Sequence, residues 1–124
     1  MRDSIINQTQ SIQAVTDTNA EKLLHDLVAT PSPSYEERDA VELLVRWMQA
    51  HDYDDAYIDE AGNAVGIIGD GAHDVVLLGH IDTFPGNLPV KVDGRLLYGR
   101  GAVDAKGSLC TFAVAARRAH IPEN

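Results

Sequence analysis

Apolar residues recur at helical spacing near the start of the chain. Between positions 18 and 29 they fall three or four residues apart and share one helix face: Leu23, Leu24, Leu27 and Val28. Thr18 followed by Glu21 is a capping-box pattern, which predicts that this helix begins at Thr18. Pro31 and Pro33 end the helix and keep the linker after it extended.

The same periodicity returns after the linker. A broad apolar stripe predicts a second helix that runs to about His51: Ala40, Val41, Leu44, Val45, Trp47 and Met48. Ser34 followed by Glu37 is another capping-box pattern and predicts where this second helix begins.

From residue 56 onward the pattern is typical of strands. Residues 56–59 and 64–68 are short segments rich in Tyr, Ile and Val, with turn residues between them. Residues 75–78 form a continuous apolar run bounded by polar residues, which favours a strand buried on both faces. The pair Asp93-Gly94 separates 90–92 from 96–98 and predicts a hairpin.

The last predicted element is a helix from about Lys106 to Ala119. It is apolar nearly all round, so we expect it to be buried against the sheet. Arg117 and Arg118 fall in its last turn, where cations complement the helix dipole. Helices, then strands, then a covering helix predict an α/β fold with a layered mixed sheet flanked by helices. We divide the chain into a polar tail, residues 1–17, and one domain portion, residues 18–124.

Composition and charge narrow the function classes. The 124 residues suffice for one domain. A formal net charge of -9 argues against a nucleic-acid or anionic-membrane surface. No apolar run reaches the roughly 18 residues of a membrane helix, and the polar N-terminus lacks a secretion-signal pattern, so we expect a cytoplasmic protein. A single cysteine, Cys110, cannot form an internal disulfide, which fits a reducing compartment.

Two short segments carry candidate chemistry. His80 and Asp82 follow the predicted strand 75–78, where open α/β sheets place their sites. Asp104 follows a glycine-rich stretch and precedes a predicted helix, so it is either a helix cap or a metal-bridging carboxylate. Each motif alone is weak, since a His-x-Asp pair is common by chance. A phosphate cradle is disfavoured because the stretch has no Gly-Lys-Ser/Thr ending.

In combination, these motifs resemble the metal-site signature of the zinc-dependent exopeptidase and deacylase family. The match is Gly-His-x-Asp-Thr at 79–83, the proline at 85, and Gly-Arg-Gly-x-x-Asp-x-Lys-Gly at 99–107. The likeness extends over residues 20–119 and includes Pro-Ser-Pro-Ser at 31–34 and the segment 60–63. The family includes acetylornithine deacetylase, succinyl-diaminopimelate desuccinylase and glutamate-releasing carboxypeptidases. Within the family, the chain most resembles the hydrolases that release lysine or ornithine from an amino-group carrier protein. Four segments support this resemblance: Val76 to Thr83, Pro85-Gly86, Leu88 to Val90 and Gly101 to Gly107.

The resemblance implies a role for each candidate residue. His80 resembles a metal ligand, Asp82 the catalytic aspartate that orients it, and Asp104 the carboxylate that bridges two Zn²⁺ ions, for which Co²⁺ can substitute. It also implies a cis peptide between Asp104 and Ala105. We expect His80, Asp82 and Asp104 to converge at one edge of the sheet, with His80 and Asp104 within about 8 Å of each other because paired metals lie roughly 4 Å apart.

The resemblance further implies a biosynthetic amide hydrolase, homodimeric when complete. Its substrate is an acylated amino acid or an acidic amino-group carrier protein. The Glu-Glu pair that holds the family's general base does not follow Asp104, so the chain resembles the N-terminal portion of the catalytic domain, and we expect it to be inactive alone. The alternatives are an acetylornithine-deacetylase-like, desuccinylase-like or carboxypeptidase-like enzyme and, from another class, a shortened non-catalytic binding module.

Overall fold

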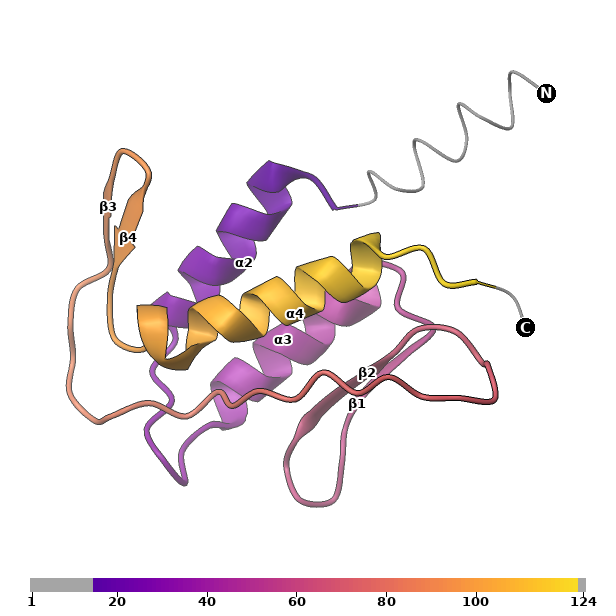
Figure 1. The fold of residues 1–124 in the computed structure, drawn as a ribbon. Coiled ribbons are helices and arrows are strands. Elements are labelled where there is room, and N and C mark those ends of the chain that lie inside the picture. The colour runs from indigo at the N-terminus through magenta and orange to yellow at the C-terminus, as the bar shows by residue number, and fades with distance from the viewer. Residues whose placement is uncertain (1–14, 123–124) are drawn as a thin grey trace.

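The computed structural model describes residues 15–122 as three helices, one short wide turn and two hairpins (Figure 1). In chain order the elements are α2 (Asp17–Ala29), α3 (Arg38–Ala50), β1 (Asp55–Ile58), β2 (Ala64–Ile67), β3 (Lys91–Asp93), β4 (Leu96–Tyr98), η1 (Ala102–Lys106) and α4 (Gly107–Arg118). The fold class is α/β, as predicted. None of the helices in this part of the chain has the length and apolar character needed to cross a membrane.

The N-cap of the first helix lies two residues before the predicted cap. Thr16 is the N-cap, and its hydroxyl accepts a hydrogen bond from the Asn19 backbone at 3.1 Å. The capping box at Thr18 was therefore wrong. Residues 1–14 of the predicted polar tail lie outside the described residues, whereas Val15 is fully buried in the core and accepts two hydrogen bonds from Arg118 through its carbonyl.

The second helix confirms the predicted stripe but not its predicted cap. The buried residues of α3 are Ala40, Val41, Leu44, Val45 and Met48, and His51 closes its C-terminal end. Its N-cap is Glu37, and the Ser34 hydroxyl binds Asp82 instead. Local spacing gave the wrong partner because Asp82 lies 48 residues away along the chain.

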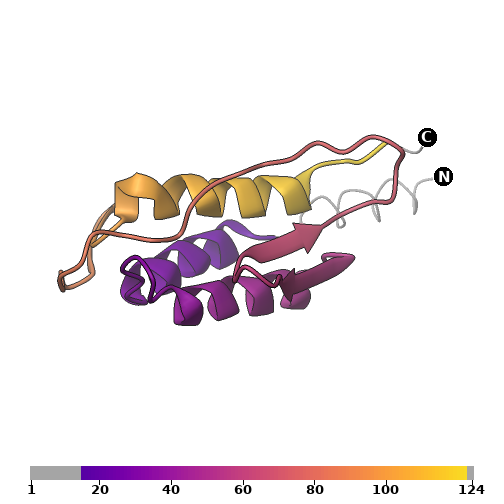
Figure 2. The ribbon, with the colours of Figure 1, turned by 90° about the horizontal axis from the view of Figure 1, so that it is seen from below.

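The two hairpins form within one residue of their predicted bounds. β1 pairs with β2 in antiparallel register, with Ala56 opposite Gly66, and this hairpin packs on α3. β3 pairs with β4, and Gly94 in the turn between them has a left-handed φ of 58°. Figure 2 shows the β1–β2 hairpin beside α3, on the opposite side of the helices from the β3–β4 end.

The predicted strand at residues 75–78 is not formed. No strand is assigned there, and all four side chains are exposed, Val75 by 91%. The segment runs extended beside α4 (Figures 1 and 2). At its end Gly79 lies close to Leu109 and Phe112 of that helix. An apolar run becomes a central strand only where neighbouring strands pair with it, and residues 15–122 provide no such neighbour. The two ladders therefore remain separate and do not join into one layered sheet.

The C-terminal helix is less buried than predicted. α4 packs against α2 through Cys110, Ala113 and Val114, while Thr111 and Ala115 are exposed. The expectation of near-complete burial was wrong because the sheet that would cover the outer face is not formed. Its last turn carries the predicted cations, and Arg118 bonds Asp17 at 2.9 Å, which ties the end of α4 to the start of α2.

Candidate metal site

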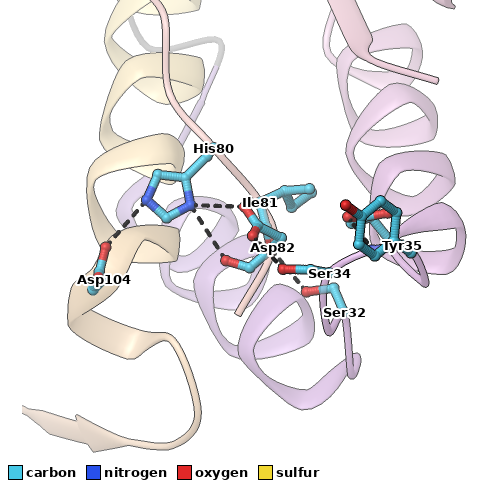
Figure 3. A network of polar contacts seen from close by, with 8 residues as sticks. Ser32, Ser34, Tyr35, His80, Ile81, Asp82 and Asp104 are labelled. Carbon is cyan, nitrogen blue, oxygen red and sulfur yellow. Dashed lines mark hydrogen bonds and ion pairs between the residues drawn. The ribbon is translucent and has the colours of Figure 1, made fainter. Parts of the chain in front are cut away.

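His80, Asp82 and Asp104 come together, as predicted. The imidazole of His80 lies between the two carboxylates, with Nδ1 at 3.1 Å from Asp82 Oδ1 and Nε2 at 3.1 Å from Asp104 Oδ1 (Figure 3). The three residues do not stand at the edge of a sheet, because the preceding strand is absent. They lie where the extended segment from residue 79 passes the turn η1 at the start of α4.

The Pro-Ser-Pro-Ser linker at 31–34 fixes the backbone on both sides of Asp82. The Thr83 amide donates to the Ser32 carbonyl at 2.9 Å, and Pro33 forms a parallel bridge with Thr83. The fully buried Ser32 donates its hydroxyl to the Ile81 carbonyl at 2.8 Å. The linker was predicted only to be extended, and its pairing with residues 81–83 is a long-range contact that no local pattern indicates.

Gly101 allows the turn η1 to bring Asp104 toward His80. Its φ is 77°, in the left-handed region that favours glycine, and a Cβ placed there would collide with the Thr83 side chain. The Gly101 carbonyl accepts from the Lys106 amide at 2.9 Å, which closes the turn around Asp104. The peptide between Asp104 and Ala105 is cis, as the resemblance implied.

We predict that Gly101→Ala lowers the free energy of unfolding by about 2–4 kcal/mol, since a left-handed alanine costs about 1–2 kcal/mol and the contact with Thr83 adds to it. The matched control is Gly94→Ala, where φ is also positive but a Cβ would meet nothing within 4 Å. The difference between the two variants in urea unfolding isolates the steric contact. Equal losses would show that Gly101 is required only for its backbone angle.

Lys106 anchors the end of η1 to α2. Its side chain is 1% exposed, and Nζ donates to the carbonyls of Leu27 and Thr30 at 2.7 and 2.8 Å. Burial lowers the pKa of Lys106 to about 8 because it disfavours the charged form. This buried position, with two backbone carbonyls as partners, is not what the sequence analysis predicted for Lys106. The helical spacing did indicate its burial, since Lys106 shares one helix face with the buried residues Cys110 and Ala113.

Electrostatics favour the charged form of His80. Partial burial opposes that charge, but hydrogen bonds to Asp82 and Asp104 outweigh it, so the pKa of His80 is raised. The pKa of Asp82 is lowered, first by the hydrogen bond from Ser34 and then by His80. The contact stabilises the fold at pH values below the ordinary pKa of histidine, and the contribution fades as the pH rises through the raised pKa. Its contribution to stability is small, because water screens the exposed pair.

We predict that Asp82→Asn lowers the pKa of His80, because it removes the carboxylate whose hydrogen bond most favours the charged ring. The pKa is measured by following the imidazole resonances of His80 in an NMR titration. Asp93→Asn, in the β3–β4 hairpin, serves as the control and should leave it unchanged. An unshifted pKa in Asp82→Asn would mean that Asp104 alone sets the charge of His80.

The donor atoms fit two positions of a zinc site. Nitrogen and oxygen ligands each bind zinc at about 2.0–2.2 Å, so two donors on one tetrahedral ion lie roughly 3.3 Å apart. His80 Nε2 and Asp104 Oδ1 are 3.1 Å apart. The two atoms would have to move only slightly away from each other to bind the same ion. Asp82 faces the other ring nitrogen, as a carboxylate does when it orients a ligand rather than binding the metal. Among the described residues, no group of three or more His, Cys, Asp or Glu side chains is arranged to hold a metal.

An open pocket of about 420 Å³ lies beside this group. Its walls come from the linker after α2, the loop at residues 83–90, and Arg100. Thr83 belongs to this pocket, but His80, Asp82 and Asp104 do not. The three residues therefore stand on open surface next to a hollow rather than inside it.

Comparison with known proteins points to one family. The model of "Peptidase family M20/M25/M40" matches residues 76–123. The chain is 53% identical over 97 residues to the LysW-lysine hydrolase of Deinococcus radiodurans, covering 77% of this chain and 26% of the relative. It is 43% identical over 91 residues to a putative LysW-lysine/LysW-ornithine hydrolase of Thermococcus kodakarensis, covering 73% and 26% respectively. The chain thus spans about a quarter of the length of these curated relatives.

Proposed function

Because this chain belongs to peptidase family M20/M25/M40, we propose that it supplies the N-terminal part of a metal-dependent amide hydrolase that releases lysine or ornithine from a LysW-type carrier protein. The observation that carries the proposal is the His80 ring, held at Nδ1 by Asp82 and facing Asp104 through Nε2. The names of the relatives support the choice of substrate.

Each residue of the site has a distinct task in this proposal. His80 would hold a Zn²⁺ ion through Nε2, and Asp104 would supply the carboxylate ligand shared by the metal positions. Asp82 keeps the proton of His80 on Nδ1, so that Nε2 presents its lone pair. The metal pair would polarise the scissile carbonyl and lower the pKa of a water molecule.

Location and assembly extend the same proposal. The enzyme acts in the cytoplasm as a homodimer, and the buried free Cys110 suits a reducing compartment. A carrier protein of acidic character would be repelled by a net charge of -9, so its binding would require a basic surface that compensates for this charge.

A chimera tests the proposal directly. The part of the Deinococcus radiodurans relative that aligns with this chain is replaced by the corresponding residues of this chain. The chimera should release lysine from LysW-lysine, lose that activity on chelation and regain it with Zn²⁺. The matched control is the same chimera carrying His80→Ala, which should be inactive. Equal activity with and without His80, in a folded chimera, would reject the proposed role of this site.

A further inference from the structure

Ser34 is the one linker residue whose side chain reaches the site. Its hydroxyl donates to Asp82 Oδ2 at 2.8 Å, across 48 residues of sequence (Figure 3). The backbone around it is held independently, because Thr83 pairs with Ser32 and the Ser32 hydroxyl binds Ile81. Ser34 thus acts from a fixed segment on a carboxylate whose own backbone is also fixed.

We propose that Ser34 is a positioning residue, which holds the Asp82 carboxylate against His80 Nδ1 and thereby leaves Nε2 of His80 ready for a metal. The positioning rests on the geometry of this chain alone. Only its purpose, metal binding in an amide hydrolase, rests on the function proposed above.

The two oxygens of Asp82 are divided between two partners. Oδ2 accepts from Ser34, and Oδ1 lies 3.1 Å from His80 Nδ1. A carboxylate that is hydrogen-bonded at one oxygen cannot rotate about its Cβ–Cγ bond without breaking that hydrogen bond. The other oxygen therefore stays directed at His80 Nδ1. The hydrogen bond from Ser34 also comes first among the effects that lower the pKa of Asp82, which keeps the carboxylate charged.

Restraint matters here because the site is open and His80 has competing partners. The Asp82 and His80 side chains are both partly exposed, so water competes for each contact. A neutral imidazole carries one N–H proton. Asp104 Oδ1 lies 3.1 Å from Nε2 and would accept a hydrogen bond from the competing Nε2–H tautomer. The backbone carbonyl of Asp82, 3.3 Å from Nδ1, is the remaining acceptor on the correct side.

The ratio of the two neutral tautomers of His80 reports this competition. In the 124-residue chain without metal, ¹⁵N NMR of the imidazole at a pH above its pKa distinguishes the Nδ1–H form from the Nε2–H form. We expect the Nδ1–H form to dominate in the wild type. Ser34→Ala should reduce the ratio of Nδ1–H to Nε2–H by roughly 2- to 10-fold, as expected for the net loss of one hydrogen bond that is open to solvent.

Two further variants separate positioning from a general effect on the fold. Ser34→Thr keeps the hydroxyl, and since Ser34 is exposed there is room for the extra methyl group, so it should restore the wild-type ratio. Ser108→Ala removes an exposed hydroxyl from α4 and should leave the ratio unchanged. An unchanged tautomer ratio in folded Ser34→Ala would overturn the proposal and would assign the control of Nδ1 to the Asp82 backbone carbonyl.

Activity is a separate readout. In the chimera described above, Ser34→Ala should lower kcat more than it raises KM, and Ser34→Thr should recover the rate. If the chimera proves inactive but the tautomer ratio still shifts, the positioning by Ser34 stands and the proposed function fails. If the chimera is active but neither the ratio nor kcat responds to Ser34→Ala, the function stands and the positioning role fails.

Discussion

Replacing Lys106 with methionine should lower the free energy of unfolding by about 2–4 kcal/mol, because two charge-assisted hydrogen bonds are lost inside the protein. The Thr30 carbonyl would lose the donor that the structure gives it, whereas the Leu27 carbonyl would keep its bond from the Thr30 amide. Methionine preserves the apolar stem, so little cavity forms. Relief from burying a charge offsets part of the loss.

Urea unfolding of the purified chain measures this effect. Lys22→Met is the matched control, since Lys22 is an exposed cation paired with Asp26 four residues away and its removal should cost no more than about 0.5 kcal/mol. If Lys106→Met is as stable as the wild type, the energy of the buried contacts is balanced by the cost of burying the charge, and Lys106 is no anchor.

Replacing Asp104 with alanine in the chimera should reduce hydrolysis by about 10²–10⁴-fold, the factor that corresponds to losing several kcal/mol of metal-dependent stabilisation. Asp82→Asn should cause a smaller loss of about 10–100-fold, because Asp82 acts through His80 rather than on the metal. Lysine release and bound zinc are measured on the same samples. Asp93→Ala, in the β3–β4 hairpin, is the matched control.

Stability distinguishes a chemical effect from a folding effect in this experiment. The Asp104 side chain is 88% exposed, and its hydrogen-bond partner among the described residues is the exposed His80 ring, so its removal should leave the unfolding transition nearly unchanged. Full activity and full zinc content in Asp104→Ala would show that this carboxylate is not a ligand. A loss of activity accompanied by unfolding would assign Asp104 a structural role instead.

Periodicity was enough to locate the helices, since their buried faces repeat along the sequence. The hairpins were located from their strand-forming residues and from turn residues such as Asp93-Gly94. Periodicity failed at residues 75–78, because an apolar run shows that a segment suits burial but does not show which strand would pair with it. The same limit explains the capping boxes. Ser34 matched a local rule, yet the hydroxyl bonds a residue that the sequence places 48 positions away.

The site residues were found through the resemblance rather than through chemistry read from the sequence. A His-x-Asp pair such as His80 and Asp82 is common by chance. Asp104, considered alone, fits a helix cap as well as it fits a metal ligand. Their convergence is confirmed by the structure, whereas their roles as ligands and orienting group remain a prediction. The parts that sequence reasoning missed, Lys106 and the pairing of the linker with residues 81–83, all depend on contacts between distant segments.

We expect the stretch from Val75 to Leu78, which joins no sheet, to influence how this chain behaves in concentrated solution. Its exposed apolar side chains and extended backbone would offer a second copy a template for cross-chain pairing, the step that starts aggregation. The net charge of -9 opposes that encounter through repulsion between copies. Salt shortens the reach of the repulsion to about 8 Å at physiological ionic strength without weakening the apolar attraction. Dilute, low-salt buffer is therefore the condition that keeps the chain dispersed.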